Sequence, residues 1–275
     1  MLAESYLENC PLVGLSIAGF DPSGGAGVLA DLKTFAAHGI YGEACLTLLT
    51  IQSTAGVQKV KASDAGWVAE TLACLAQDNA FSVIKIGAIA NFKVAQVVTE
   101  FLRRNATVPV VLDPVMVSSS GASLLDEDGR EFLRAELLTL ADWVTPNLVE
   151  LGLLTRGTVT TSDEVEKCAQ LVELTGSKIN LLVTGGHLEK PDDYLILPGE
   201  SSGRWIAGNR VESLATHGTG CTLSSAIAAR IAKFPAENPE VTVIEAKRYL
   251  EGAMRNAPGI GRGPGPMEHF WRGSL

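Results

Sequence analysis

The sequence of 275 residues predicts an α/β fold with a central, mainly parallel sheet and helices on both faces. Short apolar runs of strand length alternate with segments of helical periodicity along nearly the whole chain. The run at 108–112 is almost entirely Val and Leu, which is typical of a parallel strand buried on both faces. Ligands of such sheets bind beyond the carboxyl ends of the strands, so the loops that follow strands are the first candidates for a site.

The apolar runs predict strands at 13–18, 44–51, 82–86, 108–112, 143–145 and 180–184, and an antiparallel pair at 193–197 and 204–209. Helical periodicity predicts helices at 28–38, 64–77, 91–104, 126–138, 162–176, 221–233 and 243–255. In the first of these, Leu29, Leu32 and either Phe35 or Ala36 fall on one face. Ser63 or Asp64 is suited to cap the second helix, and Gly176 to close the fifth.

The composition excludes several classes of protein. A net charge of −9 argues against a general nucleic-acid or anionic-membrane binder. The five cysteines are odd in number and include no CxxC pair, so we expect no zinc or disulfide framework and a reducing, cytoplasmic location. Residues 1–11 lack the basic region of a signal peptide, and no apolar run reaches the ~18 residues of a membrane helix. We expect a single domain, with an extension at 1–12 and an irregular Gly/Pro-rich tail at 258–275.

The glycine-rich loop at 19–27 joins the first strand to the first helix. It lacks the Lys-Ser/Thr ending of a P-loop and the spacing of a dinucleotide fingerprint. It serves either a ligand or only the close approach of the helix to the sheet. Asp31, one turn into the helix, either faces the cleft or favours the helix N-terminus.

Two later strands end in carboxylates. Asp113 follows the all-apolar strand and precedes Pro114, so it either orients a metal or phosphate-bound water or forms a turn. Asn147 is suited to cap a helix. Glu150, three residues on, either completes a capping box or reaches a magnesium ion through water. At 183–187, glycines permit close approach of a nucleotide, and His187 is more typical of a hydrogen-bonded structural histidine.

The segment 216–221 is the most informative in the chain. Gly218 and Gly220 bracket Thr219, and Cys221 stands where a helix is expected to begin. Unpaired N–H groups and the positive end of a helix suit a phosphoryl group. A helix N-terminus or a nearby cation lowers a thiol pKa, so we expect a lowered pKa for Cys221. The alternative is a thiol buried under the loop.

Together and in this order, these loops resemble the hydroxymethylpyrimidine/phosphomethylpyrimidine kinases of thiamin biosynthesis, in the ribokinase-like superfamily. The matching segments are 18–27 with 30–35, 52–54 with 56–58, 85–87, 111–116, 145–150, 185–188 and 216–223. The resemblance implies a three-layer α/β/α kinase domain and a homodimer. It also implies ATP as co-substrate, Mg²⁺, and phosphorylation of an aminopyrimidine alcohol and of its monophosphate.

The resemblance also assigns residues. The pyrimidine pocket would be lined by Gly19, Ala26, Asp31, Thr50, Gln52, Ala88, Val115 and Cys221, with Gln52 on the ring edge. Asp113 and Glu150 would serve the magnesium and phosphate region. Asn147, Thr184 and Gly186 would lie near the nucleotide. The backbone of Gly218, Thr219 and Gly220 would form the anion hole, and Cys221 would replace the aspartate base of many relatives.

Four positions depart from the family pattern. Phe20 replaces a small residue, and Ala88 replaces the methionine usual against the pyrimidine. Ser119 and Thr184 stand at positions where lysines are usual. Loss of two positive charges predicts weaker phosphate binding, most of all for the second phosphorylation. The alternatives are a pyridoxal, pyridoxine or other vitamin-alcohol kinase, and a non-catalytic pyrimidine-binding protein.

Overall fold

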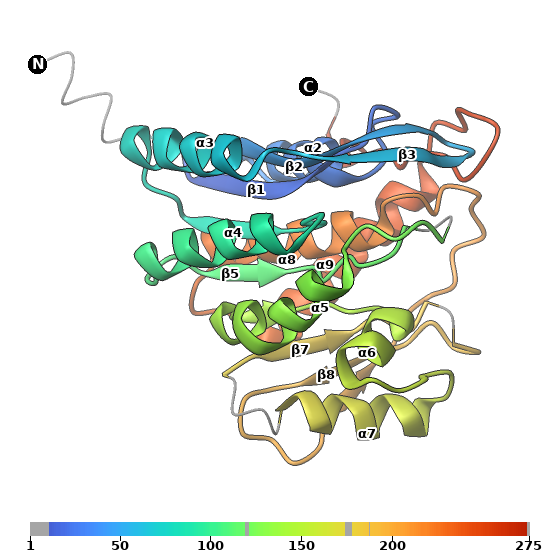
Figure 1. The fold of residues 1–275 in the computed structure, drawn as a ribbon. Helices are drawn as coiled ribbons and strands as arrows, with labels where there is room; N and C mark the ends of the chain where they lie inside the picture. Colours follow the sequence, from blue (N-terminus) through green and yellow to red (C-terminus); the bar gives the residue numbers. More distant parts are fainter. Residues whose placement is uncertain (1–10, 119–120, 174–177, 187, 274–275) are drawn as a thin grey trace, which may run out of the picture.

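The computed structural model describes residues 11–118, 121–173, 178–186 and 188–273. Its strands form one nine-stranded sheet in the order β3-β2-β1-β4-β5-β6-β7-β8-β9 (Figure 1). The pairs from β2 to β7 are parallel, whereas β2–β3, β7–β8 and β8–β9 are antiparallel. The expected mainly parallel sheet is therefore confirmed, and so is the antiparallel pair near its end.

The strands are β1 (Val13–Phe20), β2 (Tyr41–Ser53), β3 (Gly56–Ala62), β4 (Val83–Ile86), β5 (Val110–Leu112), β6 (Trp143–Val144), β7 (Asn180–Val183), β8 (Asp193–Ile196) and β9 (Arg204–Ile206). The α-helices are α2 (Gly27–Ala37), α3 (Ala65–Asp78), α4 (Phe92–Arg104), α5 (Glu127–Phe132), α6 (Leu148–Thr155), α7 (Ser162–Glu173), α8 (Thr219–Lys233) and α9 (Pro239–Arg255). A π-helical turn (Leu133–Leu137) and a 3₁₀ turn (Leu138–Leu140) follow α5.

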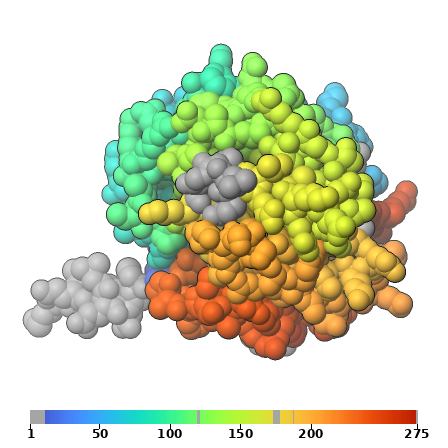
Figure 2. All heavy atoms as spheres, turned by 90° about the horizontal axis from the view of Figure 1, so that it is seen from below, coloured from blue at the N-terminus to red at the C-terminus, as the bar shows by residue number. Residues whose placement is uncertain are grey.

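Helices cover both faces of the sheet, which gives the expected three layers. Helices α3 to α7 lie on one face, and α2, α8 and α9 lie on the other (Figure 1). Because side chains alternate along a strand, each central strand feeds both cores. In β4, Ile84 and Ile86 belong to the core under α3 and α4, and Val83 to the core under α8. Figure 2 views the β9 end of the sheet, where the yellow α7 region and the orange segments after β8 form the surface.

Local sequence signals explain several element boundaries. Asp64 caps α3 by accepting from the Trp67 N–H, as its position predicts. Asn147 and Glu150 form a capping box at the start of α6, one of the two roles expected of them. Helix α9 begins four residues before the expected start because Asn238 caps it and Pro239 occupies its first turn.

The principal element missed from the sequence is β3, which pairs antiparallel with β2 to form a hairpin at the edge of the sheet. Its residues are mostly exposed and include Lys59 and Lys61, so it has no apolar run of the kind that marks a buried strand. Charged residues on an edge strand protect it against unwanted pairing. The hairpin carries Thr50 and Gln52, so it bears directly on the candidate site.

Other boundaries differ less. Strand β1 continues through Gly19 and Phe20, which were expected in a loop. Helix α8 begins at Thr219, two residues before Cys221, and the expected helix at 126–138 changes to π and 3₁₀ geometry after Phe132. Residues 258–273 form turns and bends. The predictions for 1–10, Ser119, Gly176 and His187 lie outside the described residues. No helix in the described part of the chain is long and apolar enough to cross a membrane.

Candidate active site

The N-terminus of α8 meets the loop after β1 at the carboxyl edge of the sheet. Gly218 precedes α8 with φ of 80°. A Cβ there would lie 1.8 Å from the Gly25 carbonyl oxygen, so only glycine fits. The N–H groups of the first helical turn lack partners within the helix and lie at its positive end. Gly220 lies beside Asp113, with its ideal Cβ position 3.7 Å from Oδ2. The structure thus brings the expected phosphate cradle next to Asp113.

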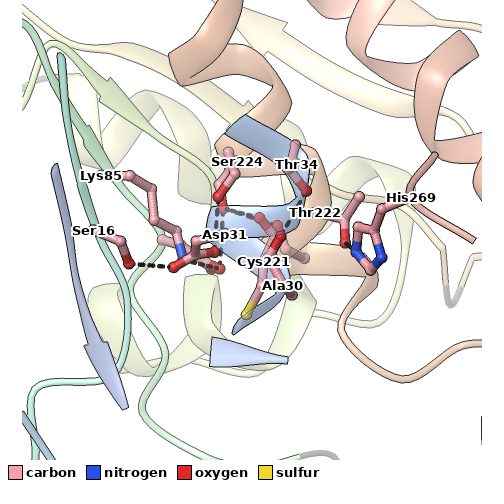
Figure 3. Close-up of polar contacts among 12 residues, drawn as sticks. Ser16, Ala30, Asp31, Thr34, Lys85, Cys221, Thr222, Ser224 and His269 are labelled. Carbon is pink, nitrogen blue, oxygen red and sulfur yellow. Dashed lines mark hydrogen bonds and ion pairs between the residues drawn. The ribbon is translucent and has the colours of Figure 1, made fainter. Parts of the chain in front are cut away.

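Beneath this cradle, Asp31 is fully buried and its carboxylate accepts four hydrogen bonds. Ser16 Oγ donates at 2.6 Å, Ser225 Oγ at 2.7 Å, and Lys85 Nζ at 2.9 and 3.0 Å. Figure 3 shows Ser16 and Lys85 converging on Asp31. Asp31 therefore has both oxygens occupied and joins α2 to β1, β4 and α8.

Lys85 also lies 3.9 Å from Asp113 Oδ2. Burial lowers the pKa of Lys85, but its acidic neighbours, Asp31 first, outweigh burial and raise that pKa, so Lys85 is charged. Asp113 is 3% exposed. Burial, helped by the charge of Asp31, raises the Asp113 pKa to about 6 against the opposing effect of Lys85. Lys85 thus lies near two carboxylates, and its charge is closer to Asp31 than to Asp113.

Cys221 is half-buried in the first turn of α8. Its thiol lies near the Asp113 carboxylate and the Gly27 N–H, and both influence its pKa. Burial raises the pKa of the Cys221 thiol to about 12, and Asp113 and Asp31 add to this shift against Lys85. The expectation of a lowered thiol pKa is therefore wrong for the ligand-free site: burial outweighs the nearby cation, and Cys221 is a neutral thiol at pH 7.

Glu150 and Asp113 make a second acidic region. Glu150 is 3% exposed, and it accepts from the Asn147 N–H at 2.9 Å while Asn147 accepts from the Glu150 N–H at 3.0 Å. Burial and then the charge of Asp113 raise the Glu150 pKa well above its usual value. The buried Thr145 Oγ1, on the same strand-end turn, has no hydrogen-bond partner in the described part of the molecule.

These features fit a magnesium ion that keeps most of its water. Two repelling carboxylates and an unsatisfied hydroxyl oxygen favour a hard cation. No group of three or more His, Cys, Asp or Glu side chains suited to a metal occurs within the described residues. Water and substrate phosphates would therefore complete the coordination, as magnesium prefers.

The expected nucleotide residues lie together at the ends of β6 and β7. Asn147 and Thr184 pair as an isolated parallel bridge. The next N–H, of Gly185, donates to Asp193 Oδ1 at 2.9 Å, and Lys247 holds Asp193 Oδ2 at 2.6 Å. Gly186 is exposed, with no atom within 4 Å of its ideal Cβ position. The Asp193–Lys247 pair, which the sequence analysis missed, thus fixes the loop that presents Gly186.

The hairpin side of the site carries Thr50 and Gln52. The Thr50 hydroxyl lies 3.0 Å from the Phe20 carbonyl oxygen and 3.1 Å from Gln52 Oε1. Gln52 Nε2 lies 3.2 Å from His217 Nε2, and that nitrogen lies 2.7 Å from Asp21 Oδ2. Asp21 and His217 were not among the expected site residues, although each lies in a loop that the sequence singled out.

The remaining expected residues differ in exposure. Ala26 and Val115 are half-buried. Ala88 is 9% exposed and its carbonyl accepts from Thr47. Gly19 is buried, and a Cβ there would lie 2.6 Å from the Leu48 side chain. Gly19 and Ala88 therefore contribute little side-chain surface.

The strongest missed signal was Lys85, which stands among apolar residues in β4. A lysine in a fully buried strand needs an acidic partner, since an isolated buried charge is unstable. Asp31 and Asp113 are the partners it finds.

Comparison with known proteins identifies similar chains. A family model described as phosphomethylpyrimidine kinase matches residues 21–268. The hydroxymethylpyrimidine/phosphomethylpyrimidine kinase of Rhizobium meliloti is 42% identical over 269 residues, covering 94% of this chain and 97% of that protein.

Two solved structures are also similar. The phosphomethylpyrimidine kinase of Clostridium difficile shares 31% identity with a TM-score of 0.74, covering 87% of this chain and 97% of that one. The pyridoxal kinase of Staphylococcus aureus in complex with AMP-PCP and pyridoxal shares 25% identity with a TM-score of 0.80, covering 96% and 95%. These neighbours confirm the expected ribokinase-like fold.

Replacement of Lys85 by Met is expected to lower the free energy of unfolding by about 3–5 kcal/mol, because Asp31 would be left buried and unpaired. Urea denaturation at pH 7 measures this. Lys93→Met, at an exposed position of α4, is the matched control and is expected to stay within about 0.5 kcal/mol of wild type. Equal stability of the two variants would contradict the role given to Lys85.

Proposed function

Because this chain belongs to the phosphomethylpyrimidine kinase family, we propose that it phosphorylates 4-amino-5-hydroxymethyl-2-methylpyrimidine, and then the resulting monophosphate, with ATP in thiamin biosynthesis. The observation that carries the proposal is the N-terminus of α8, where Cys221 and the preceding backbone N–H groups lie beside Asp113. This arrangement unites an anion-binding backbone with a proton-accepting pair. ATP as co-substrate is supported by the AMP-PCP complex of the similar kinase.

The hydroxymethyl group of the substrate would lie against Cys221, with the transferring phosphoryl group on the N–H groups of Thr219, Gly220 and Cys221. As the hydroxyl oxygen bonds to the γ-phosphorus of ATP, the bond from that phosphorus to the bridging oxygen breaks and ADP leaves. The hydroxyl proton passes to Sγ, and the thiol proton passes to Asp113. This relay requires no thiolate in the resting site. The Asp113 carboxylate, with a pKa of about 6, is mostly ionised at pH 7 and able to accept the proton.

Glu150 and Thr145 would hold a magnesium ion with water and phosphates, and Asp113 would face that ion through a bound water, which leaves its carboxylate able to accept the proton. When bound, this ion would neutralise charge on the phosphates. Asn147, Thr184 and Gly186 would contact the nucleotide. The pyrimidine would lie between the β2–β3 hairpin and the loop after β1, among Ala26, Thr50, Gln52 and Val115, with Gly19, Asp31 and Ala88 behind this surface.

The second phosphorylation would be the slower one. Thr184 is half-buried and offers a hydroxyl where the family resemblance implies a lysine, and Lys85 is too deeply buried to meet a ligand. The monophosphate already carries negative charge, so it loses more from a missing cation than the alcohol does.

A pyridoxal-type kinase is the second candidate, favoured by the TM-score of 0.80 to the S. aureus enzyme. The hydroxymethylpyrimidine reading is preferred because its relatives reach 42% identity over 94% of the chain. A non-catalytic pyrimidine-binding protein is disfavoured by the intact arrangement of Asp113, Glu150 and Cys221.

We also infer a homodimer formed through β2. Leu49 and Ile51 are 43% and 56% exposed on the face of β2 opposite Thr50 and Gln52. Neighbouring exposed apolar side chains on one strand face favour a protein contact. The described cysteines, Cys45, Cys74, Cys168 and Cys221, are free thiols, which supports the proposal of a reducing, cytoplasmic location.

Coupled kinase assays at saturating Mg-ATP test the function with the aminopyrimidine alcohol, its monophosphate, pyridoxal and pyridoxine. We expect turnover of the alcohol and slower turnover of the monophosphate. Cys221→Ala is expected to lower kcat about 100-fold or more through loss of the proton relay. Cys74→Ala, at an exposed position of α3, is the control. No turnover of either pyrimidine would refute the proposal.

The Asp113→Asn variant is expected to change stability and kinase activity in opposite directions. Because the pKa of Asp113 in the folded protein, about 6, exceeds its ordinary value of 3.8, its stabilising contribution is complete below pH 3.8 and is lost as pH rises through 6. At pH 8 the variant is therefore expected to be more stable than wild type, by on the order of 2 kcal/mol, with little difference near pH 4. Urea denaturation at both pH values measures this.

The same variant is expected to lose kinase activity, and wild-type kcat to fall as pH drops below about 6. If the variant were less stable than wild type at pH 8, the buried Asp113 carboxylate would not be destabilising. If its kcat were unchanged, Asp113 would not accept the proton.

Ile51→Lys is expected to convert the dimer to a monomer, since a charge at the centre of an apolar contact must be desolvated. Sedimentation velocity measures the change. Leu171→Lys, on the exposed face of α7, is the matched control and is expected to leave the dimer intact. A wild-type monomer at micromolar concentration would refute the dimer.

A further inference from the structure

We propose that Asp21 and His217 fix the orientation of the Gln52 side-chain amide, and that this orientation selects an aminopyrimidine edge over a hydroxypyridine edge. Both are positioning residues that act through Gln52. The identity of the ligand rests on the function proposed above, whereas the orientation of the amide does not.

His217 links the two glycine-rich loops of the site. It directly precedes Gly218 and is 8% exposed. Its ring packs against Gly25, where a Cβ would lie 2.4 Å from the ring atom Cδ2. One ring nitrogen, Nε2, faces both Asp21 Oδ2 at 2.7 Å and the Gln52 amide at 3.2 Å. The protonation of Nε2 therefore decides the polarity of both contacts.

Asp21 requires Nε2 to be a donor. Its carboxylate is 3% exposed and already accepts from the Ser23 N–H at 2.8 Å, the Ser23 hydroxyl at 2.7 Å and the Ala26 N–H at 2.9 Å. Burial raises the pKa of Asp21, but the hydrogen bonds from His217 and Ser23 together outweigh it, so the group is ionised. An ionised carboxylate only accepts hydrogen bonds. At 2.7 Å, an unprotonated Nε2 would set lone pair against lone pair.

A donor at His217 Nε2 requires the oxygen of the Gln52 amide, not its NH₂ group, to face the ring. The oxygen and nitrogen of a glutamine amide are assigned from such contacts. With the oxygen toward His217, the NH₂ group turns to Thr50 Oγ1, the other atom beside the amide at 3.1 Å. Thr50 accepts this bond and donates its own hydrogen to the Phe20 carbonyl at 3.0 Å. Every donor in this series of hydrogen bonds, from His217 to the Phe20 carbonyl, then meets an acceptor.

This orientation leaves Gln52 one N–H and one oxygen lone pair for a ligand, in a fixed order along the amide. A 4-aminopyrimidine presents a ring nitrogen beside an exocyclic NH₂ group, which is an acceptor next to a donor and complements that order. A 3-hydroxypyridine has no donor adjacent to its ring nitrogen. Because a buried polar group left unpaired is costly, a locked amide discriminates against that ring.

Nitrogen-15 NMR of the ligand-free protein tests the orientation without any substrate. The expected result is a protonated Nε2 at His217, with the signal assigned by its loss in His217→Phe. An unprotonated Nε2 would overturn the proposal.

Calorimetry then tests the selectivity, with the aminopyrimidine alcohol and pyridoxine as probes. His217→Phe, which frees the amide, is expected to narrow the ratio of the two Kd values about tenfold by weakening aminopyrimidine binding. Thr50→Val is expected to act in the same direction, and Thr50→Ser, which keeps the hydroxyl, to remain within about twofold of wild type. Equal weakening of both ligands in His217→Phe would mean a merely structural role and would overturn the selectivity.

Kinetics supply a readout that loss of fold would not mimic. In His217→Phe we expect KM for the aminopyrimidine to rise about tenfold while kcat changes less, since the amide binds the ring and not the reacting hydroxyl. A fall in kcat at constant KM would overturn the proposal. If wild type bound no aminopyrimidine, the proposed function would fail, whereas the NMR result would still decide the orientation of Gln52.

Discussion

The buried ion pair between Lys85 and Asp31 is the interaction on which the rest of the site depends. Through Ser16 and Ser225, Asp31 connects β1 and α8 to α2, and Lys85 adds β4. Four elements thus meet at one carboxylate, and α8 is held with its N-terminus beside Asp113. Replacing such a pair by apolar residues often costs little, so its retention is better explained by what its charge does to its neighbours.

The positive charge of Lys85 acts more strongly on Asp31 than on Asp113. Lys85 lies 2.9 Å from Asp31 and 3.9 Å from Asp113, so Asp31 is neutralised and Asp113 is left with a pKa of about 6. Cys221, beside both carboxylates, stays protonated. The site therefore stores a proton on sulfur and an acceptor on Asp113, and Lys85 influences both without reaching the ligand. Since Thr184 also adds no charge, phosphate binding would rest on backbone N–H groups and a metal.

The sequence was sufficient for the parallel sheet and for the capping box at the start of α6 because these depend on local signals. The run at 108–112 and the capping pair Asn147 and Glu150 required no knowledge of distant residues. The pKa of Cys221 was predicted in the wrong direction because a helix N-terminus is visible in sequence, whereas burial beside two carboxylates is a property of the assembled fold. The edge strand β3 was missed because its exposed lysines leave no apolar run of the kind that marks a buried strand. Asp21 and His217, 196 residues apart, meet only in three dimensions.

The contact between Asp21 and His217 also joins the loop after β1 to the start of α8. Gly218 packs against the carbonyl of Gly25, and His217, its neighbour, binds Asp21 in the β1–α2 loop. A shift of the β1–α2 loop on ligand binding would therefore move the residue that starts α8, and with it the N–H groups that hold phosphate. Packed contacts of this kind do not deform gradually, and this one is so close that a Cβ added at Gly218 would lie 1.8 Å from the Gly25 carbonyl oxygen. Under the proposed function, recognition of the ring and positioning of the phosphate cradle would consequently be coupled through Gly25, His217 and Gly218.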